Sequence, residues 1–276
     1  RPVRGCCTRT LVENGWLFCR VRSVFRLTEK TTLTQDMILY ADRPQVDFET
    51  RVDWHETHRL LKTGFDMAVH AAYVRHEIQF GYLERPCYKN TSWEKAMFEV
   101  VNHKYTDFSE PGYGVALLND GKYGISVEGS RAALSLIKSG THPDPRGDEG
   151  VHDFTYSLLT HSGFCWENVI RPAYELNYPL RPVPGEGKAV HPVVECDRKN
   201  VIPETVKPAE DGSGIIVRLY ESEGTGGPVT LRLHAPARRV LSTNLLEEET
   251  GELPLEEGKI RLQVSPFEIV TLKLLF

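Results

Sequence analysis

The sequence predicts an all-β protein made of β-sandwiches. Three observations support this fold class. Apolar and polar residues alternate with period 2 in several runs, as in strands that bury one face and expose the other. Turn-forming segments such as Glu13-Asn14-Gly15, Asp120-Gly121 and Glu257-Gly258 separate these runs. Only one segment has helical spacing, and many strands with almost no helix indicate a sandwich architecture.

The strand predictions follow from the alternation. Between residues 46 and 54, Val46, Phe48, Val52 and Trp54 share one face, and acidic and basic residues occupy the other. The same pattern recurs along the chain, so each run is expected to be a strand with one buried face. In chain order, the expected strands cover residues 17–27, 46–54, 74–80, 132–137, 229–234 and 260–264.

Helix is expected mostly over residues 164–177. Pro172 either interrupts this helix or starts a second turn, since proline is tolerated only in the first turn. The apolar residues that fall at helical spacing are Trp166, Val169, Ile170, Ala173 and Leu176.

A break in composition predicts two domains. Residues 177–191 hold three prolines and two glycines in a short polar stretch, which is typical of a linker. A large sandwich is therefore expected over residues 1–182, and a smaller C-terminal sandwich over residues 190–276.

The amino-acid composition limits the classes of protein to which the chain can belong. The chain has 276 residues, a net charge of -5 and 40% hydrophobic residues, which suits a globular protein with a sizeable core. No basic patch points to nucleic acid, and no long apolar run points to a membrane. The six cysteines are scattered, with Cys6 and Cys7 adjacent, so we expect free thiols and a cytoplasmic protein. Because the chain begins at Arg1, we expect a fragment of a longer protein.

No catalytic or metal motif is evident. In His55-Glu56-Thr57-His58 the histidines are three residues apart at the end of a strand pattern, whereas a zinc helix needs them four apart. Carboxylates are plentiful, but their separation in space cannot be read from the sequence. The sequence holds no nucleophile elbow, P-loop or dinucleotide fingerprint. No catalytic residue, metal ligand or cofactor site is therefore assigned to this chain.

The segment 141–148, THPDPRGD, is the strongest candidate for a functional loop. It is charged, yet Pro143 and Pro145 stiffen it, and charged groups on rigid turns often serve binding sites. Asp144 and Arg146 are the expected substrate-binding residues, with Tyr88 and Asn90 as their neighbours. Tyr88 could stack on a sugar, although aromatic residues in sheets more often pack in the core.

A series of short segments, in chain order, resembles one known family. These segments are Asp53–Lys62 (DWHETHRLLK), Glu77–Gly81 (EIQFG), Glu84–Pro86 (ERP), Tyr113–Gly124 (YGVALLNDGKYG), Phe154–Leu158 with Tyr174–Asn177, Asn244–Glu248 (NLLEE) and Pro266–Ile269 (PFEI). Their sequence and spacing are similar to the C-terminal β-region of bacterial and vacuolar-type α-mannosidases of glycoside hydrolase family 38. The resemblance covers nearly the whole chain.

The resemblance implies a galactose-mutarotase-like supersandwich followed by a smaller C-terminal β-sandwich. It implies a retaining, zinc-dependent enzyme whose zinc ligands and nucleophile lie upstream, in an N-terminal domain outside this chain. The fragment would then be inactive alone and would wall the active site of that domain. The segment around Asp144 and Arg146 resembles a loop that borders the sugar site in family members. The implied partners are an α-mannoside and the N-terminal catalytic domain, without nucleic acid or membrane; a homo-oligomer is left open.

Two alternatives remain at this stage. An autonomous carbohydrate-binding module would show exposed aromatic side chains on one sheet face. A mutarotase-like epimerase would need a histidine and a glutamate that converge in one cleft, which spacing cannot show.

Overall fold

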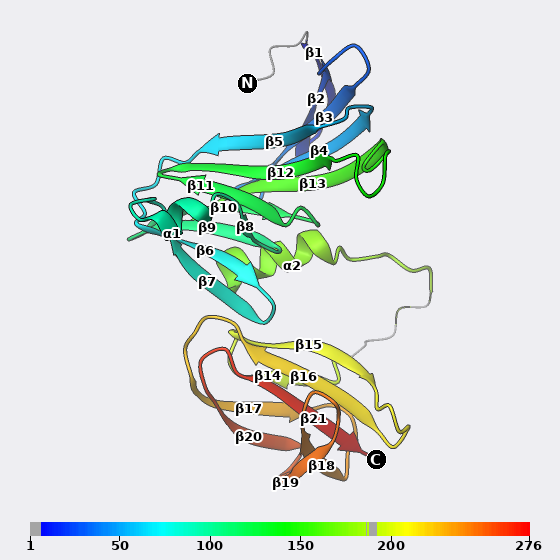
Figure 1. Cartoon of the computed structure of the whole chain (residues 1–276). Coiled ribbons are helices and arrows are strands. Elements are labelled where there is room, and N and C mark those ends of the chain that lie inside the picture. Colours follow the sequence, from blue (N-terminus) through cyan, green and yellow to red (C-terminus); the bar gives the residue numbers. More distant parts are fainter. Residues whose placement is uncertain (1–6, 186, 188–191) are drawn as a thin grey trace. The chain divides into compact units, whose positions relative to one another are not determined.

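The computed structural model describes residues 7–185, 187 and 192–276, and these residues form an all-β protein (Figure 1). Cys6 and part of the predicted linker, residues 186 and 188–191, lie outside the described residues. The chain divides into two compact units. Unit 1 holds the residues up to Ile78, Leu83–Phe164 and Asn168–Leu180; unit 2 holds Gln79–Tyr82, Cys165–Glu167 and Arg181–Phe276. The predicted fold class is confirmed.

Unit 1 is built on a nine-stranded antiparallel sheet. The strands 17–27, 46–54 and 74–80 expected from the alternation correspond to β2, β4 and β6. In sheet order the strands are β1 (Cys7–Asn14), β2 (Phe18–Arg26), β3 (Thr32–Tyr40), β4 (Gln45–Trp54), β13 (Gly150–His161), β10 (Tyr113–Asn119), β9 (Tyr105–Glu110), β6 (Tyr73–Ile78) and β7 (Gly81–Pro86).

A smaller four-stranded sheet covers part of one face of the large sheet. Its order is β5 (Arg59–Asp66), β12 (Arg131–Ser139), β11 (Gly124–Glu128) and β8 (Val100–Val101). The core lies between the two sheets, because the inward residues of both alternate with polar residues that point out. Its buried members include Val52 and Trp54 of β4, Phe108 of β9, Leu117 of β10 and Leu134 of β12.

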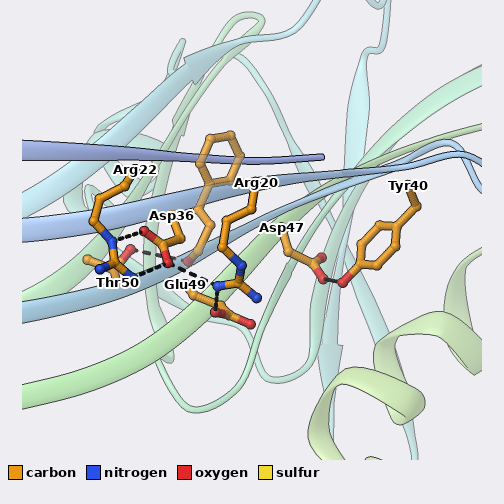
Figure 2. Close-up of polar contacts among 8 residues, drawn as sticks. Arg20, Arg22, Asp36, Tyr40, Asp47, Glu49 and Thr50 are labelled. Atoms are coloured by element: carbon orange, nitrogen blue, oxygen red, sulfur yellow. Dashed lines mark hydrogen bonds and ion pairs between the residues drawn. The ribbon is translucent and has the colours of Figure 1, made fainter. Parts of the chain in front are cut away.

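The opposite, outer face of the large sheet carries a charged network (Figure 2). Asp36 on β3 accepts hydrogen bonds from Arg22 Nε at 2.7 Å and from Arg20 at 3.0 Å, and Arg20 also pairs with Glu49 on β4. The hydrogen bond from Arg22 lowers the pKa of Asp36 despite the partial burial of that carboxyl. The network links three neighbouring strands, although the exposed Arg20–Glu49 pair contributes only about 0–1 kcal/mol.

A second polar contact on this face involves Tyr40 and the buried Asp47. The Tyr40 hydroxyl donates to Asp47 Oδ2 at 2.7 Å, and burial together with this bond raises the pKa of Tyr40 (Figure 2). Asp47 also accepts from Gln45 and Ser157, at 2.7 and 2.6 Å. The carboxylate is therefore satisfied where it is buried.

The structure also contains two short helical segments. The expected helix is present as a π-helical turn over Trp166–Ile170 that continues into α2 (Arg171–Asn177), with Pro172 in the first turn of α2. The helix α1 (Ser92–Ala96) was not predicted from the apolar pattern, because it buries no residue. Thr91 and Glu94 form a capping box that starts α1. None of the helices in the described part of the chain is long and apolar enough to cross a membrane.

Unit 2 is a smaller β-sandwich. One sheet has the order β14 (Val194–Cys196), β17 (Gly227–Leu233) and β20 (Lys259–Val264). The other has the order β15 (Val201–Pro208), β16 (Ile215–Glu221), β21 (Ile269–Leu275), β18 (Arg239–Thr243) and β19 (Glu249–Leu253). Alternating residues such as Val229, Leu231 and Leu272 form its core. The strands expected at 229–234 and 260–264 correspond to β17 and β20.

Among the glycines of the large sheet, Gly114 on β10 leaves the least room for a side chain. A Cβ atom there would lie 2.2 Å from His161 Cε1 and 2.9 Å from the Phe108 carbonyl oxygen. We therefore expect Gly114→Ala to lower the free energy of unfolding by roughly 1–3 kcal/mol through overpacking. Urea denaturation would measure this loss. The matched control is Gly163→Ala, since a Cβ at Gly163 would meet nothing within 4 Å; equal stability of the two variants would contradict the packing.

Candidate functional site

The predicted loop 141–148 joins β12 to β13 and has a defined internal structure. The Arg146 N–H donates to Asp144 Oδ1 at 2.9 Å, and the Glu149 N–H donates to the Arg146 carbonyl at 3.0 Å. The two ends of the loop meet at Gly147, where a Cβ atom would lie 3.2 Å from the Gly140 carbonyl oxygen. Side-chain and backbone hydrogen bonds therefore fix the shape of the loop.

The segment that follows β4 lies against this loop. The His58 N–H donates to the Ser139 carbonyl at 2.7 Å, and His58 Nε2 lies 3.4 Å from Thr141 Oγ1. His55 Nδ1 lies 3.4 Å from Glu149 Oε1. The structure thus joins the DWHETH segment to the THPDPRGD loop, two motifs more than 80 residues apart, which sequence reasoning had treated separately.

His55 and His58 lie just beyond the end of a strand, where the strand pattern ended in the sequence. The strand β4 ends at Trp54, and His58 has a φ of 53°, so both histidines lie in a turn. The turn aims them at the loop instead of at opposite faces of a sheet. Glu56 anchors this turn: it accepts from Thr28 and from Thr31 Oγ1 and pairs with Arg59 Nε at 3.1 Å. The hydrogen bond from Thr28 contributes most to lowering the pKa of Glu56.

His55 links the turn to the loop electrostatically. Its ring lies between Glu149 and Asp53, with Nε2 2.8 Å from Asp53 Oδ1. The hydrogen bond with Glu149 is the main cause, and the charge of Asp53 a further one, of a pKa of His55 above its ordinary value. A protonated His55 therefore joins both carboxylates to the turn.

Asp144 and Arg146 are exposed at the tip of the loop. Apart from the Asp144–Arg146 turn bond, neither side chain has a hydrogen bond or ion pair within the described residues. A carboxylate and a guanidinium fork on one short loop can accept from and donate to neighbouring hydroxyl groups of a sugar. They supply no activated nucleophile or metal-bound water.

The expected position of Tyr88 and Asn90 beside Asp144 and Arg146 is wrong. The Gly129 N–H donates to the Cys87 carbonyl at 2.9 Å, so Tyr88 and Asn90 lie near the start of β12. The loop 141–148 follows the other end of this nine-residue strand, about 30 Å away at 3.3 Å per residue. Figure 1 shows α1, which follows Asn90, and the β12–β13 loop at opposite ends of unit 1. Sequence spacing could not reveal this distance.

The structure gives little support to the two alternative functions, an epimerase and a carbohydrate-binding module. His76 and Glu94 line one cavity, but its volume of about 30 Å³ suits a single water and not a sugar. Burial also lowers the pKa of His76 to about 4. The three most exposed aromatic residues of the described chain, Trp16, Trp93 and Phe98, lie in a hairpin turn, in α1 and in a loop, and not on a sheet face.

The His55–Glu149 contact predicts a pH-dependent stability. Because the folded-state pKa of His55 is raised above the unfolded value of about 6.5, the contact stabilises fully below that pH. Its contribution is lost as the pH rises through the folded-state pKa. Glu149→Gln should therefore lower the pKa of His55, measured by NMR, and destabilise the chain at about pH 5.5 but not at about pH 9. The control Glu128→Gln, an exposed glutamate on β11, should change neither quantity.

Two family models match the chain. The model described as "Glycosyl hydrolases family 38 C-terminal domain" matches residues 3–146, and "Glycosyl hydrolases family 38 C-terminal beta sandwich domain" matches residues 200–272. The first covers about half of the chain and falls mostly in unit 1, and the second lies within unit 2.

Curated relatives agree along nearly the whole chain. Alpha-mannosidase 2C1 of Homo sapiens is 39% identical over 99% of this chain, and alpha-mannosidase G of Dictyostelium discoideum is 36% identical over 98%. The alpha-mannosidase of Saccharomyces cerevisiae is 30% identical over 94%. The chain spans only about a quarter of the length of these relatives, 26–27%.

A solved structure supports the fold. The alpha-mannosidase from Enterococcus faecalis V583 matches 98% of this chain with a TM-score of 0.79 at 18% identity, and the match covers 35% of that chain. The chain therefore belongs to glycosyl hydrolase family 38, as the C-terminal β-region of its α-mannosidases.

Proposed function

We propose that this chain is the non-catalytic C-terminal part of an enzyme that hydrolyses terminal α-mannosides. The observation that carries the proposal is the match to curated α-mannosidases through both units, at 30–39% identity. Because the chain spans about a quarter of these relatives, the groups that break the glycosidic bond are assigned to the rest of the polypeptide. The chain's own task is to support and complete the substrate site.

Zinc chemistry belongs to that other part of the polypeptide in this proposal. Within residues 7–185, 187 and 192–276, no group of three His, Cys, Asp or Glu side chains could hold a metal ion. The pair His55 and His58 does not fit a zinc ion, since His55 is engaged by Asp53 and Glu149. No step of the reaction is therefore derived through a metal held by this chain.

The loop 141–148 is the proposed contact with the mannoside. Its backbone is held by the Asp144–Arg146 turn bond and by the close approach of Gly140 and Gly147, so little conformational entropy is lost when a sugar docks. The charged side chains of Asp144 and Arg146 are exposed and have no competing ion-pair partner in the described structure. Asp144 would accept from sugar hydroxyls and Arg146 would donate to them, which orients the ring relative to the reacting groups.

Tyr88 and Asn90 are not part of this contact. One sugar ring is much shorter than the strand of about 30 Å that separates them from Asp144. A role for them in binding would require a second, separate contact with a longer glycan.

The test uses kinetics of the full-length enzyme. Asp144→Ala or Arg146→Ala should lower kcat/KM by roughly 10–100-fold, which is about 1.4–2.8 kcal/mol of transition-state stabilisation. The matched variant Asp144→Asn separates two roles, because asparagine can keep the turn bond to the Arg146 N–H and loses only the charge. A loss with Asp144→Asn as large as with alanine indicates direct contact with substrate.

Zinc content and thermal stability serve as controls and should not change in these variants. If both alanine variants keep wild-type kinetics in a folded, zinc-loaded enzyme, the loop is only a turn and the proposed contact is wrong.

A further inference from the structure

The smaller sheet covers only part of the inner face of three strands of unit 1, β1–β3. Leu33 of β3 is buried and Phe25 of β2 packs on the core, whereas Leu11 of β1 and Leu39 of β3 remain exposed. The register places Leu11, Val21, Met37, Phe48 and Tyr156 in one row across β1, β2, β3, β4 and β13. Directly paired residues of an antiparallel sheet point to the same face. All five side chains therefore belong to the inner face, which carries the core.

The row is covered at one end only. Phe65 of β5 packs on Phe48 and Tyr156, with ring centroids 5.7 and 6.1 Å apart. Beyond Phe48 the smaller sheet has ended, because β5 is its edge strand. Leu11 is 57% exposed, and every residue of β1 is exposed.

The exposed part of the inner face has the composition of a buried surface. Its side chains on β1–β3 are mainly apolar, whereas the outer face of the same strands carries Arg20, Arg22 and Asp36. Apolar-in and polar-out alternation is typical of a strand with one face on a core. The members of the inner face that line this uncovered region are Leu11, Cys19, Val21, Met37 and Leu39.

A cavity continues this face between the two sheets. It has a volume of about 500 Å³, and its apolar walls include Leu39, Val46, Phe65, Val115 and Leu158. The cavity therefore lies where additional strands packed on the inner face of β3 would meet the edge of β5. In the described structure, β5 pairs with β12 alone, so the other edge of β5 presents unpaired backbone groups.

We propose that amphipathic β-strands from the part of the polypeptide outside this chain extend the smaller sheet at β5 and cover the inner face of β1–β3. About three strands at a spacing of about 4.8 Å would extend over the exposed part of β1–β3. Their backbones pair with the open edge of β5, and their apolar side chains fill the cavity and pack on Leu11, Val21 and Leu39. The occupant is assigned to the parent polypeptide because the chain spans only 27% of its relatives' length.

The inference rests on the proposed function only in that it treats the chain as part of a longer polypeptide. Its test does not use activity, so either proposal can fail alone.

The test compares thiol labelling of this chain alone with labelling of the longer polypeptide. Leu11→Cys places a probe on the inner face of β1, and Thr10→Cys places the matched control on the outer face, paired with Arg22. Peptide mass spectrometry after reaction with a maleimide gives the rate at each position. In the chain alone both positions should react quickly. In the longer polypeptide the rate at position 11 should fall by roughly tenfold or more, and the rate at position 10 should not.

The native Cys19, on the inner face of β2, repeats the measurement without a substitution. Equal behaviour of positions 10 and 11 in the longer polypeptide, both labelled or both protected, overturns the proposal. Protection of position 11 in the chain alone, together with a dimer mass by light scattering, also overturns it and assigns a second copy as the cover.

Discussion

Burial of one face of a nine-stranded antiparallel sheet is the constraint on which unit 1 depends. Alternation along each strand places apolar residues on that face and charged residues on the other. A shift of one residue in the pairing would expose the apolar side chains, so burial of this face determines the register of the strands. The smaller sheet satisfies the constraint over β4, β13, β10, β9 and β6. It satisfies the constraint only in part over β1–β3, where Leu33 is buried but Leu11 and Leu39 remain exposed.

The same constraint explains where the candidate site lies. Strands that bury a face leave their ends and connections in water, and the loop 141–148 is one such connection. The packed strands β4 and β12 hold its two supports, the turn at His55–His58 and the Gly140–Gly147 neck, in fixed positions. Charged side chains are thus displayed on a rigid framework without any cost to the core.

Local patterns in the sequence were sufficient to predict some of the strands, but not which strands lie next to each other. The period-2 alternation predicted β2, β4, β6, β17 and β20, because burial acts residue by residue. The helix α1 was missed, because it buries no residue and its only signal is the Thr91–Glu94 capping box. The strand order, with β13 between β4 and β10, depends on long-range pairing that no single run of residues encodes.

The candidate site combines local and long-range features. Loop composition identified Asp144 and Arg146, but the contact of His55 with Glu149 joins residues 94 apart and has no local signal. The distance between Asn90 and Asp144 is set by the length of β12, which becomes known only once the strand is placed in the sheet.

The most direct test of this account is the hydrolysis of an aryl α-mannoside by the purified 276-residue chain and by the longer polypeptide, each with and without zinc. If the chain supplies framework and substrate contacts alone, the chain should give no turnover above a mock preparation, and the longer polypeptide should give zinc-dependent turnover. Zinc-dependent turnover by the chain alone would contradict the assignment of catalysis to the rest of the polypeptide.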